Sequence, residues 1–375
     1  MRTRAAVLAE IGRARPYGDS RPLEIAEVEL EDPGPGELLV RIAAAGLCHS
    51  DLSVINGDRP RAVPLVLGHE AAGVVEATGP HVTRFRPGDH VVLVFAPSCG
   101  HCLPCAEGRP ALCEPAAVAA GQGTLISGAK RIRRGEAVLD HHIGVSGFAG
   151  HAVVSEASCV KIDRAVPLDR AALLGCAVLT GVGAVLNTGG LRAGQSCAVI
   201  GLGGVGLAAL LGAVAAGARQ VIAVDLAEDK LATARELGAT HAINPKEPGA
   251  LEALREISGG GVDLAVELAG AVPALEFAYE AARRGGTVVT AGLPNPQARL
   301  SLPAVSLTAN EKTLRGSYMG SCVPMRDIPR FAAMMMSGQL PIERLVTHEL
   351  RLDQINEGFE RLAAGQAIRQ VIRFD

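Results

Sequence analysis

Four of the nine cysteines in this chain of 375 residues lie close together in the stretch SCGHCLPCAEGRPALCEP. Cys99, Cys102, Cys105 and Cys113 follow the pattern C-x2-C-x2-C-x7-C, and the glycines and prolines between them let the loop fold around one point. Four thiolates on a short loop complete a closed tetrahedral shell, which is how structural zinc is held. An iron–sulfur cluster is the main rival, but its bacterial spacing ends in x3-C-P. The pattern therefore favours structural zinc.

A glycine-rich turn carries a second kind of chemistry. In VIGLGGVG, Gly201, Gly203 and Gly206 form G-x-G-x-x-G after an expected strand and at the start of an expected helix. The glycines let the backbone approach a pyrophosphate, and Asp225 at the end of the next strand is placed to bind the adenosine ribose. Because Asp225 would repel a 2′-phosphate, we expect NAD in preference to NADP. Lys230 is either a further ribose contact or an ordinary solvated lysine.

Three scattered residues have the chemistry of a catalytic metal site. Cys48 lies in GLCHSDLS, His69 in VLGHEAAG and Cys176 in LLGCAVLTG. Each alone is equally explained as a buried thiol or a satisfied core histidine. Together they supply two thiolates and one imidazole, a shell that leaves a fourth position open for catalysis. Their spacing does not establish that they meet in space.

Two kinds of element must position these groups. The first 170 or so residues contain short apolar runs such as ELLVRIAAAG, separated by Gly, Pro and Asp, which predict a β-rich domain. From about Leu173, the runs SCAVIG, QVIAVD, VDLAVELAG and GTVVTAG alternate with helical patterns, which predicts a doubly wound parallel sheet. A helix in INEGFERLAAG and a strand in IRQVIRF close the chain. The fold class is α/β.

The composition argues against several function classes. The net charge is −3, only 3% of residues are aromatic and tryptophan is absent, so we expect neither nucleic acid nor membrane as partner. The uncharged run CAVIGLGGVGLAALLGAVAAGA is divided by its glycines into strand, turn and helix. Since the N-terminal stretch also lacks a signal-peptide core, we expect a cytoplasmic protein with free or metal-bound cysteines.

The motifs together resemble a known family. GHEAAGVVEATGPHV fits the signature G-H-E-x2-G-x5-G-x2-V, and the four-cysteine loop, GCAVLTGVGAV, GLGGVG and the closing segments follow in the family's order. Over nearly its whole length the chain thus resembles the zinc-containing alcohol dehydrogenases of the medium-chain dehydrogenase/reductase superfamily. The resemblance implies a GroES-like catalytic domain (1–176), an NAD-binding Rossmann domain (177–319) and a return to the catalytic domain (320–375).

The resemblance also implies roles for individual residues. It places catalytic zinc on Cys48, His69 and Cys176, with Glu70 behind the metal as a transient ligand and Asp51 orienting the imidazole. The implied cofactor contacts, beyond the glycines and Asp225 named above, are His49, Thr180, Gly204, Val205, Leu293 and Arg369. The implied substrate pocket is apolar, although each member is equally explained as core: Phe95, Val118, Ile143, Leu293 and Met319.

The implied reaction is the interconversion of an alcohol and its carbonyl product. Zinc lowers the pKa of the alcohol, and hydride passes to C4 of the nicotinamide. Ser50 matches the hydroxyl that carries the proton away, whereas Ser53 occupies the position where many relatives have a histidine. His49 replaces an arginine that many relatives place on the pyrophosphate, so we expect weaker retention of NADH.

We therefore expect a zinc-dependent, NAD-linked alcohol dehydrogenase that acts on an uncharged primary or secondary alcohol. It would hold two zinc ions per chain and form a homodimer or homotetramer. One alternative is an NAD-linked carbonyl reductase or formaldehyde dehydrogenase-type enzyme, although EPAAVAAGQGT after Cys113 lacks the arginine that would hold glutathione. The other is a zinc- and NAD-binding structural or regulatory protein, which the intact ligand set disfavours.

Overall fold

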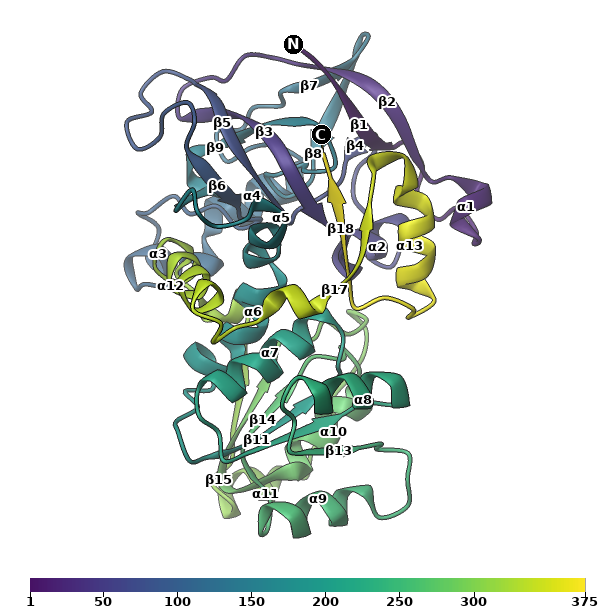
Figure 1. Ribbon diagram of the computed structural model, residues 1–375, viewed down its shortest axis with the longest axis vertical. Helices are drawn as coiled ribbons and strands as arrows, with labels where there is room; N and C mark the ends of the chain where they lie inside the picture. Colours follow the sequence, from purple (N-terminus) through teal and green to yellow (C-terminus); the bar gives the residue numbers. More distant parts are fainter. Residues whose placement is uncertain (375) are drawn as a thin grey trace. The chain divides into compact units, whose positions relative to one another are not determined.

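The computed structural model describes residues 1–374 (Figure 1). The chain divides into two compact units. Unit 1 contains Met1–Cys176, Val323–Met336 and the chain from Glu343 onward, and unit 2 contains Ala177–Cys322 and Ser337–Ile342. The functional domain boundaries expected at residues 176 and 319 stay a prediction, because compactness does not define function.

Unit 1 is rich in β-structure and contains a closed barrel. The barrel strands are β1 (Arg2–Leu8), β2 (Leu23–Leu30), β7 (Ile132–Arg134), β8 (Ala137–His141) and β4 (Leu65–Val66), in that order around the barrel. Its interior is apolar, since residues such as Val7, Val28 and Leu139 are buried together. The β-rich first domain that the sequence predicts is confirmed.

A second sheet of unit 1 is built around one long strand. Its order is β10 (Cys159–Ile162), β6 (His90–Leu93), β5 (Ala71–Thr78), β3 (Glu37–Gly46), β18 (Arg369–Arg373) and β17 (Val346–Leu350), with β9 (His151–Ser155) also paired to β3. Leu38, Val40 and Ile42 alternate along β3 and are buried, as expected for a strand with one face on a core. β18 pairs antiparallel with β3, opposing Val371 to Gly46. The end of the chain therefore completes a sheet formed mainly by its first half.

The helices of unit 1 are mostly short. They are α1 (Tyr17–Ser20), α2 (His49–Ile55), α3 (Leu103–Ala106), η1 (Pro110–Leu112), α4 (Glu114–Gln122), η2 (Glu156–Ser158), α5 (Leu168–Ala171), η3 (Ala172–Gly175), α12 (Pro324–Met336), η7 (Leu352–Gln354) and α13 (Ile355–Ala363), with η6 (Ile342–Leu345) beginning at the last residue of unit 2. On α13, Ile355, Phe359 and Leu362 recur at helical spacing and are buried. The Phe359 ring packs edge-on against Phe148, with the ring centres 5.9 Å apart.

Unit 2 is a parallel sheet whose strands are connected along the chain by helices (Figure 1). The strand order is β13 (His241–Ile243), β12 (Gln220–Val224), β11 (Ser196–Ile200), β14 (Val262–Glu267), β15 (Ala282–Thr290) and β16 (Thr313–Gly316), and every pairing is parallel. The helical segments are α6 (Ala177–Gly183), the π-helical η4 (Ala184–Thr188), α7 (Gly204–Ala215), α8 (Glu228–Glu236), α9 (Ala250–Ser258), α10 (Val272–Ala281), α11 (Ala304–Ala309) and η5 (Met319–Ser321). The doubly wound sheet predicted from the sequence is confirmed.

The strand order of unit 2 defines its binding edge. From β11 the chain proceeds outward to β12 and β13, and then returns to place β14 on the other side of β11. In sheets of this type, ligands bind beyond the carboxyl end of the strand where the order reverses. The glycine-rich turn that follows β11 occupies that position.

Within residues 1–374, no single helix combines the length and hydropathy needed to cross a membrane, and only the consecutive stretches Leu168–Gly175 and Ala177–Thr188 reach these values when counted together.

Candidate functional site

The four cysteines of the short loop converge in unit 1. The sulfur atoms of Cys99, Cys102, Cys105 and Cys113 all lie within 4.8 Å of one another. Two backbone N–H groups also point at sulfur: that of Cys99 lies 3.2 Å from Sγ of Cys113, and that of Cys102 lies 3.3 Å from Sγ of Cys99. Tetrahedral zinc with Zn–S bonds of about 2.3 Å needs sulfur atoms about 3.8 Å apart. The cluster therefore fits structural zinc.

The cysteines of this loop have different acidities. The pKa of Cys99 is lowered to about 6, first by a backbone hydrogen bond from His101. Burial raises the pKa of Cys105 to about 12. A metal cation stabilises all four thiolates at once, which is why such a closed loop binds metal tightly.

A second cluster in unit 1 contains the scattered ligands. One ligand atom from each of Cys48, His69, Glu70 and Cys176 lies within 4.8 Å of the others, and all four side chains are buried. Nε2 of His69 lies 3.3 Å from Sγ of Cys176. The structure thus brings together three residues that the sequence spacing alone could not connect.

Close backbone packing explains how these segments meet. β3 ends at Gly46, whose N–H donates to the carbonyl of Glu70 at 2.8 Å. A Cβ at Gly46 would overlap the Glu70 carboxylate, so only glycine fits beside this side chain. Gly68 has φ of +95°, and a Cβ there would lie 2.5 Å from the backbone nitrogen of Phe148. These two glycines place His69 and Glu70 against the start of α2, where Cys48 is the N-cap.

Asp51 lies behind the imidazole of His69. Nδ1 of His69 is 3.0 Å from Oδ1 of Asp51, and the N–H of Gly68 donates to the same oxygen at 3.2 Å. Burial opposes ionisation of Asp51, but His69 and then His142 lower the pKa of this carboxyl. A carboxylate bonded to Nδ1 leaves Nε2 available for a metal, the arrangement that orients ligating histidines.

The two thiols of this cluster interact directly. The pKa of Cys48 is lowered, first by the hydrogen bond from the Cys176 thiol and then, against the effect of burial, by His69. The pKa of Cys176 is correspondingly raised, first by its bond to Cys48. Two thiols that share a proton in this way are suited to a divalent cation, which replaces such protons.

Glu70 is paired with Arg369 inside unit 1. Nη2 of Arg369 lies 3.1 Å from Oε2 of Glu70, and Nη1 donates to the carbonyl of Leu47 at 3.2 Å. Burial raises the pKa of Glu70 to about 7, and the Arg369 charge opposes that rise. Arg369, which the family resemblance assigns to the pyrophosphate, therefore also balances the charge behind the metal ligands.

In unit 2, the glycine-rich turn has the shape that a dinucleotide needs. Gly201 has φ of +90°, and a Cβ at Gly206 would lie 1.8 Å from the Gly201 carbonyl oxygen. A Cβ at Gly203 would meet no heavy atom within 4 Å, so the backbone there is open to a ligand. The carboxylate of Asp225 accepts the N–H of Leu202 at 2.7 Å and that of Ala227 at 3.0 Å. These hydrogen bonds fix the position of Asp225, the predicted ribose ligand, relative to the glycine-rich turn.

The remaining predicted residues lie as follows. In unit 1, His49, Ser50 and Ser53 lie on α2, and the Phe95 ring stands perpendicular to His69 with centres 5.4 Å apart. Val118 on α4 is exposed, and Ile143 has φ of +42°. The predicted cofactor and pocket residues in unit 2 are Thr180 on α6, Gly204 and Val205 at the start of α7, Lys230 on α8, the exposed Leu293 and the buried Met319. Phe95 thus contacts a residue of the buried metal cluster.

Ser53 is engaged with its own helix. Its hydroxyl donates to the carbonyl of His49 at 2.7 Å, with the carbonyl of Ser50 at 3.2 Å. Its hydrogen is thus directed at the backbone one turn back.

Sequence reasoning missed His142. Its Nε2 lies 3.3 Å from Oδ1 of Asp51, and its ring centre lies 5.8 Å from that of His69. Burial lowers the pKa of His142. The only signal in the sequence is the His-His pair directly before Ile143, and it does not reveal which element the ring faces.

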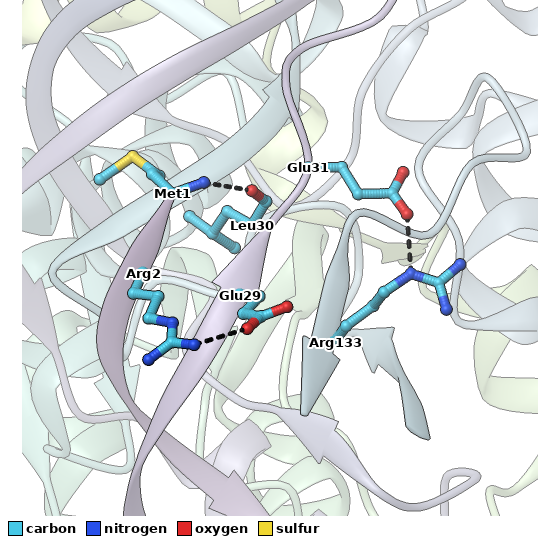
Figure 2. A pocket seen from close by; sticks show the side chains of 6 residues that line it. All are labelled: Met1, Arg2, Glu29, Leu30, Glu31 and Arg133. Carbon is cyan, nitrogen blue, oxygen red and sulfur yellow. Dashed lines mark hydrogen bonds and ion pairs between the residues drawn. The ribbon is translucent and has the colours of Figure 1, made fainter. Parts of the chain in front are cut away.

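A surface hollow of about 380 Å³ lies on unit 1 away from these residues (Figure 2). It is lined by Met1, Arg2, Glu29, Leu30, Glu31 and Arg133. Its charged groups pair with one another, Arg2 with Glu29 at 3.3 Å and Arg133 with Glu31 at 2.9 Å. The hollow contains none of the predicted site residues.

Unit 1 contains a closed four-thiolate site and an open-type cluster of two thiols, an imidazole and a carboxylate. Unit 2 contains a sheet of the type that binds dinucleotides. These features together define the class of metal-dependent oxidoreductases, and comparisons with known proteins support this class. The model of the alcohol dehydrogenase GroES-like domain matches residues 34–164, and that of the zinc-binding dehydrogenases matches residues 204–337.

Individual relatives match over the whole chain. The NDMA-dependent alcohol dehydrogenase of Amycolatopsis methanolica is 41% identical over 375 residues, with 99% of each chain covered. The structure of benzyl alcohol dehydrogenase from Acinetobacter calcoaceticus superposes with a TM-score of 0.93 at 33% identity, covering 100% of both chains. An alcohol dehydrogenase zinc-binding domain protein from Burkholderia ambifaria gives the same TM-score at 38% identity, covering 100% of this chain and 99% of the other. This chain belongs to the zinc-binding alcohol dehydrogenase family, and it is an oxidoreductase of that family.

Proposed function

We propose that this enzyme oxidises uncharged primary alcohols to aldehydes with NAD, and catalyses the reverse reaction, with secondary alcohols as poorer substrates. The observation that carries the proposal is the buried cluster of Cys48, His69, Glu70 and Cys176 in unit 1. Two thiolates and one imidazole neutralise a divalent cation and leave one coordination position for substrate oxygen.

Within this proposal, Cys48, His69 and Cys176 would hold the catalytic zinc, which would supply Lewis acidity toward the substrate oxygen. Asp51 fixes the tautomer of His69, because its carboxylate accepts the Nδ1 proton at 3.0 Å. Glu70 stays close to the ligand atoms as a transient ligand, and its pairing with Arg369 at 3.1 Å controls when its carboxylate is available.

The cofactor site is assigned to the turn after β11. Gly201, Gly203 and Gly206 form the cradle for the pyrophosphate, and the N-terminus of α7 stabilises its charge. A nicotinamide dinucleotide held by this turn would supply a hydride acceptor. Asp225 is the ribose ligand, and its negative charge favours NAD over NADP. Thr180 and Val205 are the proposed nicotinamide contacts.

The proton leaves through Ser50, the hydroxyl on the first turn of α2. Ser53 does not continue the route as a histidine would, since its hydroxyl donates to the His49 carbonyl at 2.7 Å and serine is not a base near neutral pH. The proton from Ser50 would therefore have to pass to water or to the ribose of a bound cofactor.

An aromatic primary alcohol is the substrate type that we favour. The relative from Acinetobacter calcoaceticus is named as a benzyl alcohol dehydrogenase. In this chain the Phe95 ring stands perpendicular to His69 at 5.4 Å, so an aromatic surface borders the metal ligands. The predicted pocket residues of unit 1, Phe95, Val118 and Ile143, are all uncharged, which favours an uncharged substrate.

We assign the enzyme to the cytoplasm and expect a homodimer. All nine cysteines are free of disulfides, as is usual in a reducing compartment. In unit 2, the last strand of the sheet is β16, and Val305 and Leu307 on the nearby segment α11 are exposed. A strand at the edge of a sheet and exposed apolar side chains are features through which two copies associate.

Metal analysis combined with a substrate screen tests the proposal. The wild-type protein should hold about two zinc ions per chain and form NADH from benzyl alcohol faster than from charged or bulky secondary alcohols. Cys176→Ser should lose one zinc and nearly all activity. Cys159→Ser, which changes a buried thiol of the same unit outside both clusters, should keep both zinc ions. Cys176→Ser protein with full zinc and activity would refute the assignment.

A further inference from the structure

His142 is held by an unusual backbone segment. Ile143, Gly144 and Ser146 all have positive φ, at +42°, +73° and +55°. The N–H of His142 donates to Oγ of Ser146 at 3.0 Å, and its carbonyl accepts the N–H of Val145 at 3.1 Å. Left-handed conformations cost free energy for residues other than glycine, so this segment is maintained by its surroundings. The result is a fixed position for the His142 ring.

The ring is buried between Asp51 and His69. The residue is 3% exposed, Nε2 lies 3.3 Å from Oδ1 of Asp51, and the ring stands at 71° to that of His69. Among the described residues, neither Nδ1 nor Nε2 of His142 makes a hydrogen bond of good geometry, and Nε2 is the nitrogen that lies beside the Asp51 carboxylate. A neutral imidazole carries one N–H, and the acceptor beside this ring is Asp51. The Nε2–H tautomer is therefore the one that the surroundings favour.

Asp51 needs such a donor. Its carboxylate is completely buried, and the donors directed at it are the N–H of Gly68 and Nδ1 of His69. An ionised carboxylate away from water requires several donors to offset its desolvation. A third donor from His142 would limit rotation of the carboxylate, and with it rotation of the His69 ring that this carboxylate holds.

We propose that His142 is a positioning residue of the catalytic metal site. Its Nε2–H donates to Asp51, and through Asp51 it holds Nε2 of His69 toward the sulfur of Cys176. This inference rests on the proposed zinc site, and it assigns His142 no contact with substrate. The loss that it predicts is therefore a loss of metal retention.

The test compares two variants by the rate at which zinc transfers to a chelator. His142→Phe keeps a ring of similar size without a donor, whereas His142→Gln keeps a donor near the position of Nε2. Changes to residues that support a metal ligand typically cost about 10- to 100-fold in metal affinity. We expect His142→Phe to lose zinc from the buried cluster at least about tenfold faster, and His142→Gln to restore most of the difference. Added zinc should restore the activity of His142→Phe.

The zinc held by Cys99, Cys102, Cys105 and Cys113 is an internal reference in the same molecules. Its release should be unchanged, and faster release from both sites would show a general loss of stability and overturn the proposal. A change in the KM for the alcohol with unchanged zinc release would place His142 at the substrate and also overturn it. A third zinc in the wild-type protein that His142→Phe lacks would make His142 a ligand, with the same consequence. Wild-type protein without zinc in the buried cluster would instead refute the proposed function.

Discussion

Gly203 and Gly206 stand three residues apart in the turn after β11, yet alanine is expected to lower cofactor affinity at the first and stability at the second. A Cβ at Gly206 would lie 1.8 Å from the Gly201 oxygen, where real Cβ contacts do not fall below 3.0 Å, so the turn must open by about 1.2 Å. Overpacking of this kind costs about 1–3 kcal/mol. In a unit of this size, that free energy lowers Tm by about 3–10 °C.

Alanine at Gly203 meets no heavy atom within 4 Å and keeps an ordinary φ of −70°. The free energy of unfolding should therefore change by no more than about 0.5 kcal/mol. Under the proposed assignment, the same methyl group stands where the backbone approaches the pyrophosphate. We expect the Kd for NADH to rise at least about tenfold, equivalent to about 1.4 kcal/mol.

Thermal unfolding without cofactor and a fluorescence titration with NADH measure the two effects separately. Gly203→Ala is expected to raise the Kd for NADH and leave Tm unchanged, while Gly206→Ala is expected to lower Tm. Unchanged NADH affinity in Gly203→Ala would refute the assignment of this turn to the pyrophosphate. Unchanged stability in Gly206→Ala would refute the packing argument.

Three further predictions concern charge and metal. Burial lowers the pKa of His141 from 6.5 to about 3, so between these values only the unfolded chain takes up this proton and stability falls as pH falls. At pH 5 the loss is about 2 kcal/mol. His141→Gln should remove this loss of stability between pH 7 and pH 5, as measured by urea unfolding. An equal pH dependence of the free energy of unfolding in the wild-type protein and the variant would contradict this. Cys105→Ser should release one zinc and lower Tm while the buried cluster keeps its metal, as elemental analysis would show; two retained zinc ions would contradict the four-thiolate site. Asp225→Ala should reduce the ratio of kcat/KM for NAD to that for NADP at least about tenfold, because a charged hydrogen bond is worth about 1.5–3 kcal/mol; an unchanged ratio would contradict its role at the ribose.

Local patterns in the sequence were sufficient for much of this architecture. The buried runs that became β11, β12, β14 and β15 are uninterrupted because parallel strands are covered on both faces. The four-cysteine loop is also local, since all its ligands lie within fifteen residues of chain. In both cases the information lies within one segment.

The buried metal cluster could not be predicted from local sequence patterns. Cys48 and Cys176 are separated by most of unit 1, and only the family resemblance connected them before the geometry did. His142 and the Glu70–Arg369 pair depend on which sheet strands lie side by side, and spacing along the chain carries no record of that. Ser53 illustrates a third limit, because its hydrogen bond to the His49 carbonyl depends on the rotamer that it adopts on α2.

The pairing of β18 with β3 has a consequence for biosynthesis. The residues of β18 leave the ribosome long after those of β3, because Ala177–Cys322 of unit 2 lies between them in the chain. Until then, the edge of β3 next to Gly46 lacks its partner, and Glu70 lacks the guanidinium of Arg369. Most of unit 2, from Ala177 to Cys322, is one continuous segment that is already complete. Unit 2 can thus fold while the sheet of unit 1 still lacks β18, and until β18 pairs, the free edge of β3 is open to unwanted association.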